Sequence, residues 1–119
     1  MQRILMRSKI HRATVTRTDL DYEGSCSIGP ELLRAADIAL GEQVHIVNIT
    51  NGARAVTYAI EGEPGEVALN GAMAHIGSVG DKVIIITYAH VDQSEVSGFR
   101  SHVVHVAQDN RLLEGAGVG

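Results

Sequence analysis

The dipeptide Asn51-Gly52 constrains the fold of this chain more than any other feature of its sequence. It lies between two segments rich in β-branched residues, 44–50 and 53–60. Asn-Gly is the strongest short-range signal for a β-hairpin, because a type I′ turn needs positive φ at both central residues. The sequence therefore predicts an antiparallel pair of strands in the middle of the chain, joined by a type I′ turn.

Strands are expected in other parts of the chain as well. Val, Ile and Thr make up 30 of the 119 residues, and such β-branched side chains fit the pleated, half-buried surface of a sheet. Alternation and β-branched content predict strands at 3–17 and 101–107, and a nearly all-apolar strand at 82–89 that is buried on both faces. Several short strands in a small chain favour a closed barrel, since closure removes exposed sheet edges.

Helix and loop signals are fewer. Pro30 followed by an acidic residue predicts the start of a short helix over about 30–37. Gly and Pro mark 61–66 as a loop, and 70–75 is typical of a turn or a single-turn helix. The expected fold is mainly β with short helices.

Composition argues against several classes of protein. A chain of 119 residues has the size of one domain, 1–119, with one core, and 45% hydrophobic and 20% charged residues are typical of globular proteins. The net charge is −4 and no basic run exceeds two residues, so the footprint of a nucleic-acid-binding protein is missing. The longest apolar run, 83–86, is far shorter than the roughly 20 residues that span a bilayer.

Localisation follows from the ends and the cysteine content. Charged residues near the N-terminus argue against a signal peptide, and Cys26 is the single cysteine, as fits a reducing compartment. We expect a cytoplasmic protein without nucleic-acid or membrane partners. No metal site is predicted, because His102 and His105 lie three apart on a strand and point to opposite faces.

The segment that stands out is 22–27, Tyr-Glu-Gly-Ser-Cys-Ser. Alone it is typical of a turn before a helix. Three further motifs accompany it: Lys-Ile-His-Arg at 9–12, Thr-Asn-Gly-Ala-Arg-Ala-Val-Thr-Tyr-Ala-Ile at 50–60, and Asn-Gly-Ala-Met-Ala-His at 70–75. In this joint spacing the chain resembles the bacterial aspartate 1-decarboxylases, small pyruvoyl-dependent enzymes. The resemblance covers about residues 1–89 and is weak beyond about 92.

The resemblance implies a fold, an activity and a cofactor. The fold would be a six-stranded double-psi β-barrel in a homotetramer, with active sites at the subunit interfaces. The chain would cleave itself between Gly24 and Ser25 into chains 1–24 and 25–119, and Ser25 would become a pyruvoyl group. That group would decarboxylate L-aspartate to β-alanine and CO2 through a Schiff base, for the biosynthesis of pantothenate and coenzyme A.

The residues fit this chemistry. Decarboxylation of an amino acid needs an electron sink that no ordinary side chain supplies, so a carbonyl must be bound or made. A serine can attack the preceding carbonyl, and Gly24 suits this step if it adopts a strained, positive-φ geometry. Arg54 offers a planar fork for a carboxylate and Lys9 adds a point charge, which together match the two carboxylates of aspartate.

The resemblance also assigns roles to individual residues. Tyr58 is expected to return a proton to the α-carbon, because a phenol is protonated at neutral pH, with His11 as the next candidate donor. Thr57 and Tyr58 point to opposite faces of a strand, so a site that uses both needs a bulge, a barrel rim or a subunit boundary. The expected site residues are Ser25 and Tyr58 for catalysis; Lys9, Arg54, Thr57, Gly71, Ala72 and Met73 for substrate; Gly24, Ser25 and Thr57 for maturation; and His11, Tyr22 and Asn70 in support.

Two other classes of function are kept as alternatives. An N-terminal-nucleophile hydrolase could use Ser25 or Cys26 after cleavage and would retain an amine at the new terminus. A non-catalytic β-barrel binding module would remain one intact chain. The mass of the purified protein separates these alternatives from a pyruvoyl enzyme.

Overall fold

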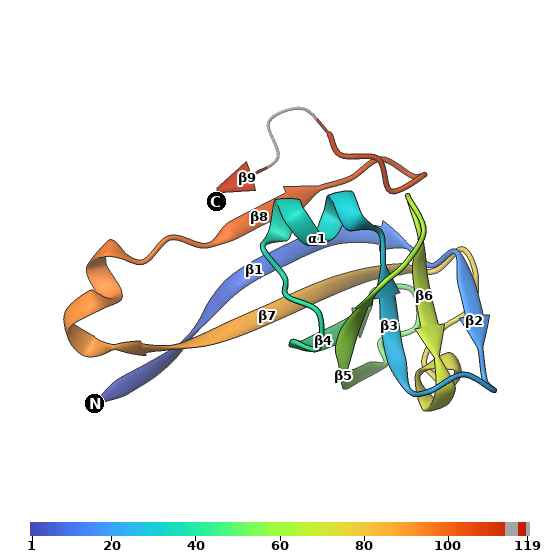
Figure 1. The fold of residues 1–119 in the computed structure, drawn as a ribbon, viewed down its shortest axis with the longest axis horizontal. Coiled ribbons are helices and arrows are strands. Elements are labelled where there is room, and N and C mark those ends of the chain that lie inside the picture. The colour runs from blue at the N-terminus through green and yellow to red at the C-terminus, as the bar shows by residue number, and fades with distance from the viewer. Residues whose placement is uncertain (114–116, 119) are drawn as a thin grey trace.

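The structure is a computed structural model that describes residues 1–113, 117 and 118, with principal extents of 44 × 31 × 25 Å (Figure 1). In chain order its elements are β1 (Gln2–Thr14), β2 (Arg17–Asp19), β3 (Ser25–Ile28), α1 (Pro30–Ala36), β4 (Gln43–Asn48), β5 (Arg54–Glu61), β6 (Val67–Asn70), the 3₁₀ helix η1 (Gly71–His75), β7 (Lys82–Asp92), the 3₁₀ helix η2 (Gln93–Gly98), β8 (His102–His105) and β9 (Gly117–Val118).

The strands of the described residues form one sheet in the order β2-β6-β3-β5-β4-β7-β1-β8-β9. β2 continues β1 after only Val15 and Thr16, although the two strands lie far apart in that order, so the sheet curves back on itself. Main-chain bonds hold this junction, because Val15 N–H donates to the Asp81 carbonyl and Thr16 N–H to the Val67 carbonyl. The prediction of a mainly β fold with short helices, in the shape of a small barrel, is confirmed.

The sheet contains nine strands in the described residues, whereas six were expected. β8 and β9 lie beyond β1, and β2 extends β1, which leaves six strands, β1 and β3 to β7, as the wall. Parallel pairs join β1 to β8, β2 to β6 and β3 to β5, and the other pairs are antiparallel. The double-psi connection stays a prediction.

The predicted central hairpin is confirmed, but the predicted type I′ turn is wrong. β4 and β5 pair antiparallel, and the pair is closed by a bond from Asn48 N–H to the Ala53 carbonyl. Among the described residues of this turn, Gly52 has a φ of 80° and Asn51 does not have a positive φ. The reason is side-chain bonding: Asn48 Oδ1 accepts the Thr50 N–H at 2.8 Å, and Asn51 Nδ2 donates to the Ile76 carbonyl at 3.1 Å. These bonds favour a four-residue loop over a two-residue type I′ turn.

The prediction that the strand at 82–89 is buried on both faces is also wrong. In β7, Val83, Ile85 and Thr87 are buried, whereas Ile84 and Ile86 are only partly buried. β7 lies inside the sheet between β1 and β4, so its edges are paired. One of its faces packs on the core, and the other faces outward within this single chain.

The core lies on the inner face of the sheet and is closed by α1. Leu32, Leu33 and Ala36 of the helix are buried against inward-facing strand residues. Pro30 occupies the first turn, and Asp37, with a φ of 56°, ends the helix, as the sequence predicted. None of the described helices is long and apolar enough to cross a membrane.

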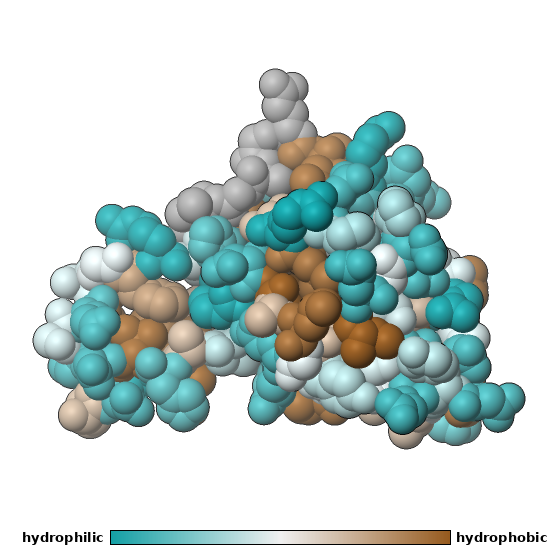
Figure 2. All heavy atoms as spheres, viewed as in Figure 1, coloured by the Kyte–Doolittle hydropathy of each residue, from teal (hydrophilic) through white to brown (hydrophobic). Residues whose placement is uncertain are grey.

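The first part of β1 and the last part of β7 extend from the barrel as an arm, with the N-terminus at its tip (Figure 1). This arm pairs Gln2 with Asp92 and Met6 with Tyr88. Ile4 on the arm is 64% exposed, and Figure 2 shows apolar surface on the arm and a second apolar area below α1. Val91 on the arm is buried, whereas the exposed Ile4 leaves part of the arm's apolar surface uncovered within this chain.

Candidate active site

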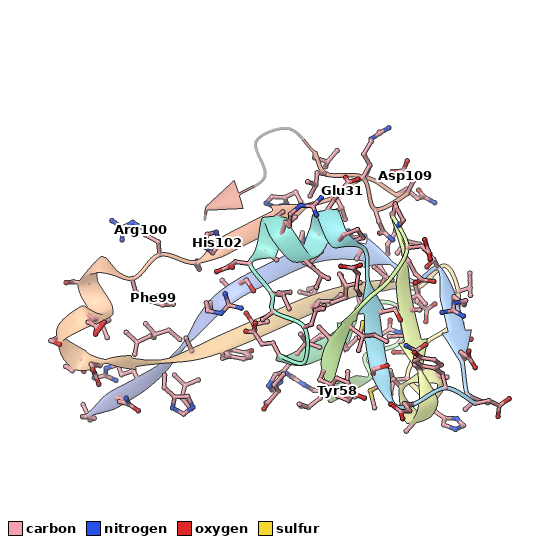
Figure 3. The ribbon with its side chains drawn as sticks, viewed as in Figure 1. Glu31, Tyr58, Phe99, Arg100, His102 and Asp109 are labelled. Carbon is pink, nitrogen blue, oxygen red and sulfur yellow. The ribbon has the colours of Figure 1, made fainter. Side chains whose placement is uncertain are left out.

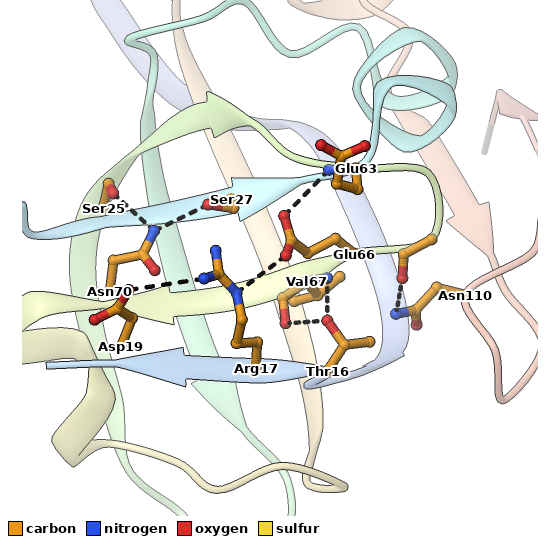
Figure 4. Close-up of polar contacts among 11 residues, drawn as sticks. Thr16, Arg17, Asp19, Ser25, Ser27, Glu63, Glu66, Val67, Asn70 and Asn110 are labelled. Carbon is orange, nitrogen blue, oxygen red and sulfur yellow. Dashed lines mark hydrogen bonds and ion pairs between the residues drawn. The ribbon is translucent and has the colours of Figure 1, made fainter. Parts of the chain in front are cut away.

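A buried polar cluster lies at the start of β3. The Ser25 hydroxyl donates to the Glu23 carbonyl at 2.9 Å and accepts a bond from Asn70 Nδ2 at 3.0 Å. The same Nδ2 donates to Ser27 Oγ at 2.9 Å (Figure 4). Ser25 and Asn70 are fully buried and Ser27 is 4% exposed. The cluster is therefore shielded from solvent within one chain.

Strand alternation explains why these side chains meet. Cys26 and Ile28 of β3 face the hydrophobic core, so Ser25 and Ser27 face the other way. Antiparallel pairing places Ser25 directly opposite Asn70, from which the amide also reaches the diagonal neighbour Ser27. Asn70 Oδ1 is buried and has no hydrogen-bond partner among the described residues.

Gly71 brings the next segment against Gly24, the residue before the bond that is expected to break. Its φ is 62°, and a Cβ there would lie 2.7 Å from the Gly24 nitrogen and Cα and 2.9 Å from the Tyr22 carbonyl. Only glycine fits such an approach. Gly24 itself does not have a positive φ, and a Cβ on it would meet nothing within 4 Å. The expectation of a strained Gly24 is therefore wrong; the geometry that requires glycine is at Gly71.

Thr57 and Tyr58 lie on β5 at the height of Gly24 and Ser25. Cys26 pairs with Ala59 in the parallel pair of β3 and β5, so Tyr58 lies level with Ser25 on the outward face. Continuing this register places Thr57 level with Gly24, on the inward side and partly buried. Tyr58 is 38% exposed and lies on the side of the molecule away from α1 (Figure 3). No register shift interrupts β5 against β4, so no bulge in this pair brings the two side chains to one face.

The expected cations lie apart from Ser25. Arg54 begins β5 and is exposed, four residues or roughly 13 Å along the strand from Tyr58. Lys9 lies on β1, and the path across the sheet from β1 to β3 passes through β7, β4 and β5. At a strand spacing of about 4.8 Å, Lys9 and Ser25 are roughly 19 Å apart around the sheet. One chain does not bring these residues together.

His11 shares the face of Lys9 and has a partner that the sequence did not indicate. His11 and His105 pair across β1 and β8, with ring centroids 5.6 Å apart and an edge-to-face contact. His11 Nδ1 is buried without a partner among the described residues. Burial, and then the nearby charges of Lys9, His105 and Arg12, lower the pKa of His11.

The remaining expected residues surround the Ser25 cluster. Tyr22 precedes it on an exposed segment, and Ala72 is exposed on η1. Met73 is partly buried and packs against the hydrophobic core. Cys26 is buried, and burial raises the pKa of its thiol to about 12. A protonated thiol that faces the core is a poor nucleophile, which disfavours a hydrolase that uses Cys26.

A cavity of 670 Å³ next to Ser27 does not suit a dicarboxylate. Its lining includes Glu61, Glu63 and Glu66, and Arg17 there is paired with Glu66 at 3.2 Å and Asp19 at 3.7 Å. Like charges would repel an anionic substrate. Within the described part of the chain, no three potential metal ligands from His, Cys, Asp and Glu converge.

Comparison with known proteins gives the family. A family model described as aspartate decarboxylase matches residues 1–113. The chain belongs to the aspartate decarboxylase family. Proteins named aspartate 1-decarboxylase are similar to it: one from Mycolicibacterium smegmatis is 56% identical over 95% of this chain and 85% of that protein. One from Myxococcus xanthus is 54% identical over 97% and 90% of the two chains, and one from Ralstonia nicotianae is 48% identical over 96% and 97%.

The family predicted from the sequence is thereby confirmed, and the match to the aspartate decarboxylase family extends beyond the expected limit near residue 89. Sequence reasoning missed Ser27 and His105 as neighbours of the site. A signal for Ser27 existed, because residues two apart on a strand share a face. His105 could not be found in this way, since its contact with His11 depends on the parallel pairing of β1 and β8.

Proposed function

We propose that this chain decarboxylates L-aspartate to β-alanine and CO2, using a pyruvoyl group made from its own Ser25, and so supplies β-alanine for pantothenate and coenzyme A. The observation that carries the proposal is the buried Ser25 hydroxyl, which receives a hydrogen bond from Asn70 and follows Gly24, the residue that Gly71 packs against. Family membership and relatives named aspartate 1-decarboxylase support the same reaction.

Maturation would begin at the Gly24-Ser25 bond. Ser25 Oγ attacks the Gly24 carbonyl carbon, the C–N bond breaks, and the hydroxyl proton ends on the Ser25 nitrogen, which leaves an ester. Loss of the Cα proton and of the Cβ–Oγ bond then releases chain 1–24 with Oγ in its new carboxylate. Water hydrolyses the resulting dehydroalanine, ammonia leaves, and a carbonyl remains at the start of chain 25–119.

The residues present fit such a group. Its precursor is held at a fixed place by two hydrogen bonds, and the cluster carries an unused buried acceptor, Asn70 Oδ1. The pyruvoyl carbonyl would supply the electron sink that decarboxylation needs. Tyr58, level with Ser25, would hold a proton on Oη for the product α-carbon, and the Thr57 hydroxyl, level with Gly24, would donate to developing negative charge during maturation.

Substrate binding is proposed to need a second copy of the chain. Lys9 lies roughly 19 Å around the sheet from Ser25, yet aspartate spans only a few ångströms between its carboxylates. The outward direction of Tyr58 and Arg54, and the exposed arm, give surfaces where another subunit could supply the missing cation. We therefore propose a homotetramer with active sites at its subunit interfaces, Arg54 and Lys9 binding the carboxylates.

The mass of the purified protein tests the reaction class. The proposal expects two fragments, 1–24 and 25–119, with loss of ammonia from the larger one and formation of β-alanine from aspartate. Cleavage with a retained amine would support the hydrolase alternative, and one intact chain that binds but does not turn over aspartate would support a binding module. Either result would overturn the proposed function.

Mixed assemblies test the shared site. Ser25→Ala and Lys9→Ala should each be inactive as pure proteins, for lack of the carbonyl and of the cation. When the two variants are co-expressed and purified as mixed oligomers, some sites combine an intact Ser25 with an intact Lys9, so part of the parent activity should return. Absence of any recovery in a verified mixed oligomer would place Lys9 and Ser25 of one site in the same chain.

A further inference from the structure

We propose that Ser27 is a positioning residue for self-cleavage, because its hydroxyl holds the Asn70 amide in the orientation that donates to Ser25 Oγ. The inference rests on the proposed function and deepens it, since neither the sequence motifs nor the family match assigns a role to Ser27. Figure 4 shows the three side chains together, with both dashed bonds leaving Nδ2 of Asn70.

The hydrogen bonds give the amide a direction. Nδ2 has two hydrogens, and each is used, one on Ser25 Oγ at 3.0 Å and one on Ser27 Oγ at 2.9 Å. The Ser25 hydroxyl proton is already committed to the Glu23 carbonyl, so Ser25 can only accept from Asn70. The reverse orientation would turn Oδ1 toward both serines and break the bond from Ser25 to Glu23.

Burial makes this arrangement sensitive to Ser27. Ser25 and Asn70 are fully buried and Ser27 nearly so, which means that solvent cannot replace a lost partner. Without the Ser27 hydroxyl, one Nδ2 hydrogen is unpaired in the interior, and the amide loses half of the bonding that fixes its orientation. Rotation then places Oδ1, an acceptor, against Ser25 Oγ.

The orientation matters to the bond-breaking steps. Ser25 Oγ gives up its proton as it attacks the Gly24 carbonyl carbon, and the N–H of Asn70 stabilises the negative charge on Oγ until the new C–O bond forms and the charge passes to the Gly24 carbonyl oxygen. The same N–H stabilises Oγ again when the Cβ–Oγ bond breaks and Oγ departs in the Gly24 carboxylate. An acceptor oxygen in this place would repel the charge at both steps.

The experiment measures the rate at which fragment 25–119 forms from freshly purified, uncleaved chain, by intact mass at fixed temperature. The parent should cleave, and Ser27→Ala should cleave more slowly by about tenfold or more, since losing an aimed donor outright commonly costs 10²–10³-fold. A matched control is Ser8→Ala, which removes another fully buried serine hydroxyl, one bonded to Thr87, and should cleave at the parent rate.

A double-mutant cycle separates positioning from general structure. Asn70→Ala should slow cleavage further than Ser27→Ala does, and adding Ser27→Ala to Asn70→Ala should change the rate no more, because Ser27 acts through the amide. Thermal midpoints of all variants, measured in parallel, show whether stability follows a different, additive pattern. If Ser27→Ala does not fold, Ser27→Cys keeps the shape with a weak acceptor and should show the same slowed cleavage.

The outcomes are distinct. A parent chain that never cleaves overturns the proposed function and this inference with it. The role of Ser27 alone is overturned if the parent cleaves and Ser27→Ala cleaves at the same rate. It is also overturned if the two substitutions slow cleavage additively in the double variant. Slow cleavage of Ser27→Ala together with no further loss in the Asn70→Ala background supports it.

Discussion

Two regions of the molecule differ in whether one chain brings their polar side chains together. One is the segment around Ser25, and the other is the outward strip, the outward face of the sheet that carries Lys9, His11 and Arg54. Ser25, Ser27 and Asn70 are buried and bonded to one another across β3 and β6. Lys9 and Arg54 lie on β1 and β5 with two strands between them, on an outward face. A buried polar group needs its hydrogen-bond partners within the chain, whereas an outward cation stays accessible to a substrate or a second subunit.

This difference separates two tasks of the proposed enzyme. Breaking the Gly24-Ser25 bond needs groups that one chain already brings together, so it should depend little on assembly. Binding a dicarboxylate needs cations that one chain holds apart, so it should depend strongly on assembly. The substitutions below test whether cleavage and substrate binding depend on different residues.

Ser25→Ala gives the largest effect and acts on the first task. Alanine has no oxygen for the acyl shift, so neither fragment should form and aspartate turnover should be lost. Alanine is no larger than serine, and the strand pairing of β3 does not use the hydroxyl, so the fold should remain. Intact mass and circular dichroism check this; fragments of the expected sizes in this variant would disprove the maturation scheme.

Tyr58→Phe should leave both tasks intact and slow the chemical step that follows substrate binding. The ring and its place beside Ser25 are kept, and the proton on Oη is lost. We expect normal cleavage at Ser25, nearly normal KM, and a fall in kcat of about 10²–10⁴-fold, the usual contribution of a positioned acid. Steady-state kinetics on protein shown by mass to be fully cleaved make the measurement. A kcat like that of the parent would mean that another residue donates the proton, and His11 is the next candidate.

Arg54→Lys should affect the second task alone. Lysine keeps the charge but loses the planar fork, so KM for aspartate should rise about tenfold, equivalent to about 1.4 kcal/mol of binding, with cleavage unchanged. Arg54 is expected on the side-chain carboxylate, because a tight hold on the departing α-carboxylate would oppose decarboxylation. A substrate-analogue complex in which Arg54 contacts neither carboxylate would exclude the contact.

Local signals in the sequence explain which parts of the fold could be predicted. The Asn51-Gly52 hairpin and the helix that begins at Pro30 depend on residues close in sequence, and both are present. The turn type was wrong because Asn51 bonds to Ile76, 25 residues away. The prediction that β7 is buried on both faces was wrong because the exposure of a strand's second face depends on which other elements cover it.

The candidate site shows the same limit. Motif spacing identified the family, and alternation correctly separated Thr57 from Tyr58. The need for glycine at Gly71 could not be predicted, since it arises from contact with Gly24, which is 47 residues earlier in the chain. The separation of Lys9 from Ser25 follows from the order of strands in the sheet, which no local pattern encodes.

The smallest expected effect concerns His11, on the outward strip. Burial and the nearby positive groups Lys9, His105 and Arg12 lower its pKa in the folded chain below the ordinary value of about 6.5. On acidification the unfolded chain therefore binds a proton before the folded chain does. The contribution of His11 to stability is present above pH 6.5 and declines as the pH falls from there to the folded pKa.

His11→Gln removes this titration and should flatten the dependence of the thermal midpoint on pH below 6.5. Asp81 also titrates, but its pKa is lowered from its ordinary carboxyl range by hydrogen bonds from the Asn48 side chain and the Ser78 N–H, so its effect comes at more acidic pH and is shared by both proteins. The comparison is best made in the Ser25→Ala background, where every chain stays intact. If the thermal midpoints of the two proteins change equally with pH between pH 6.5 and 5, His11 binds its proton as readily in the folded chain as in the unfolded one. That result would contradict the lowered pKa that the burial of His11 implies.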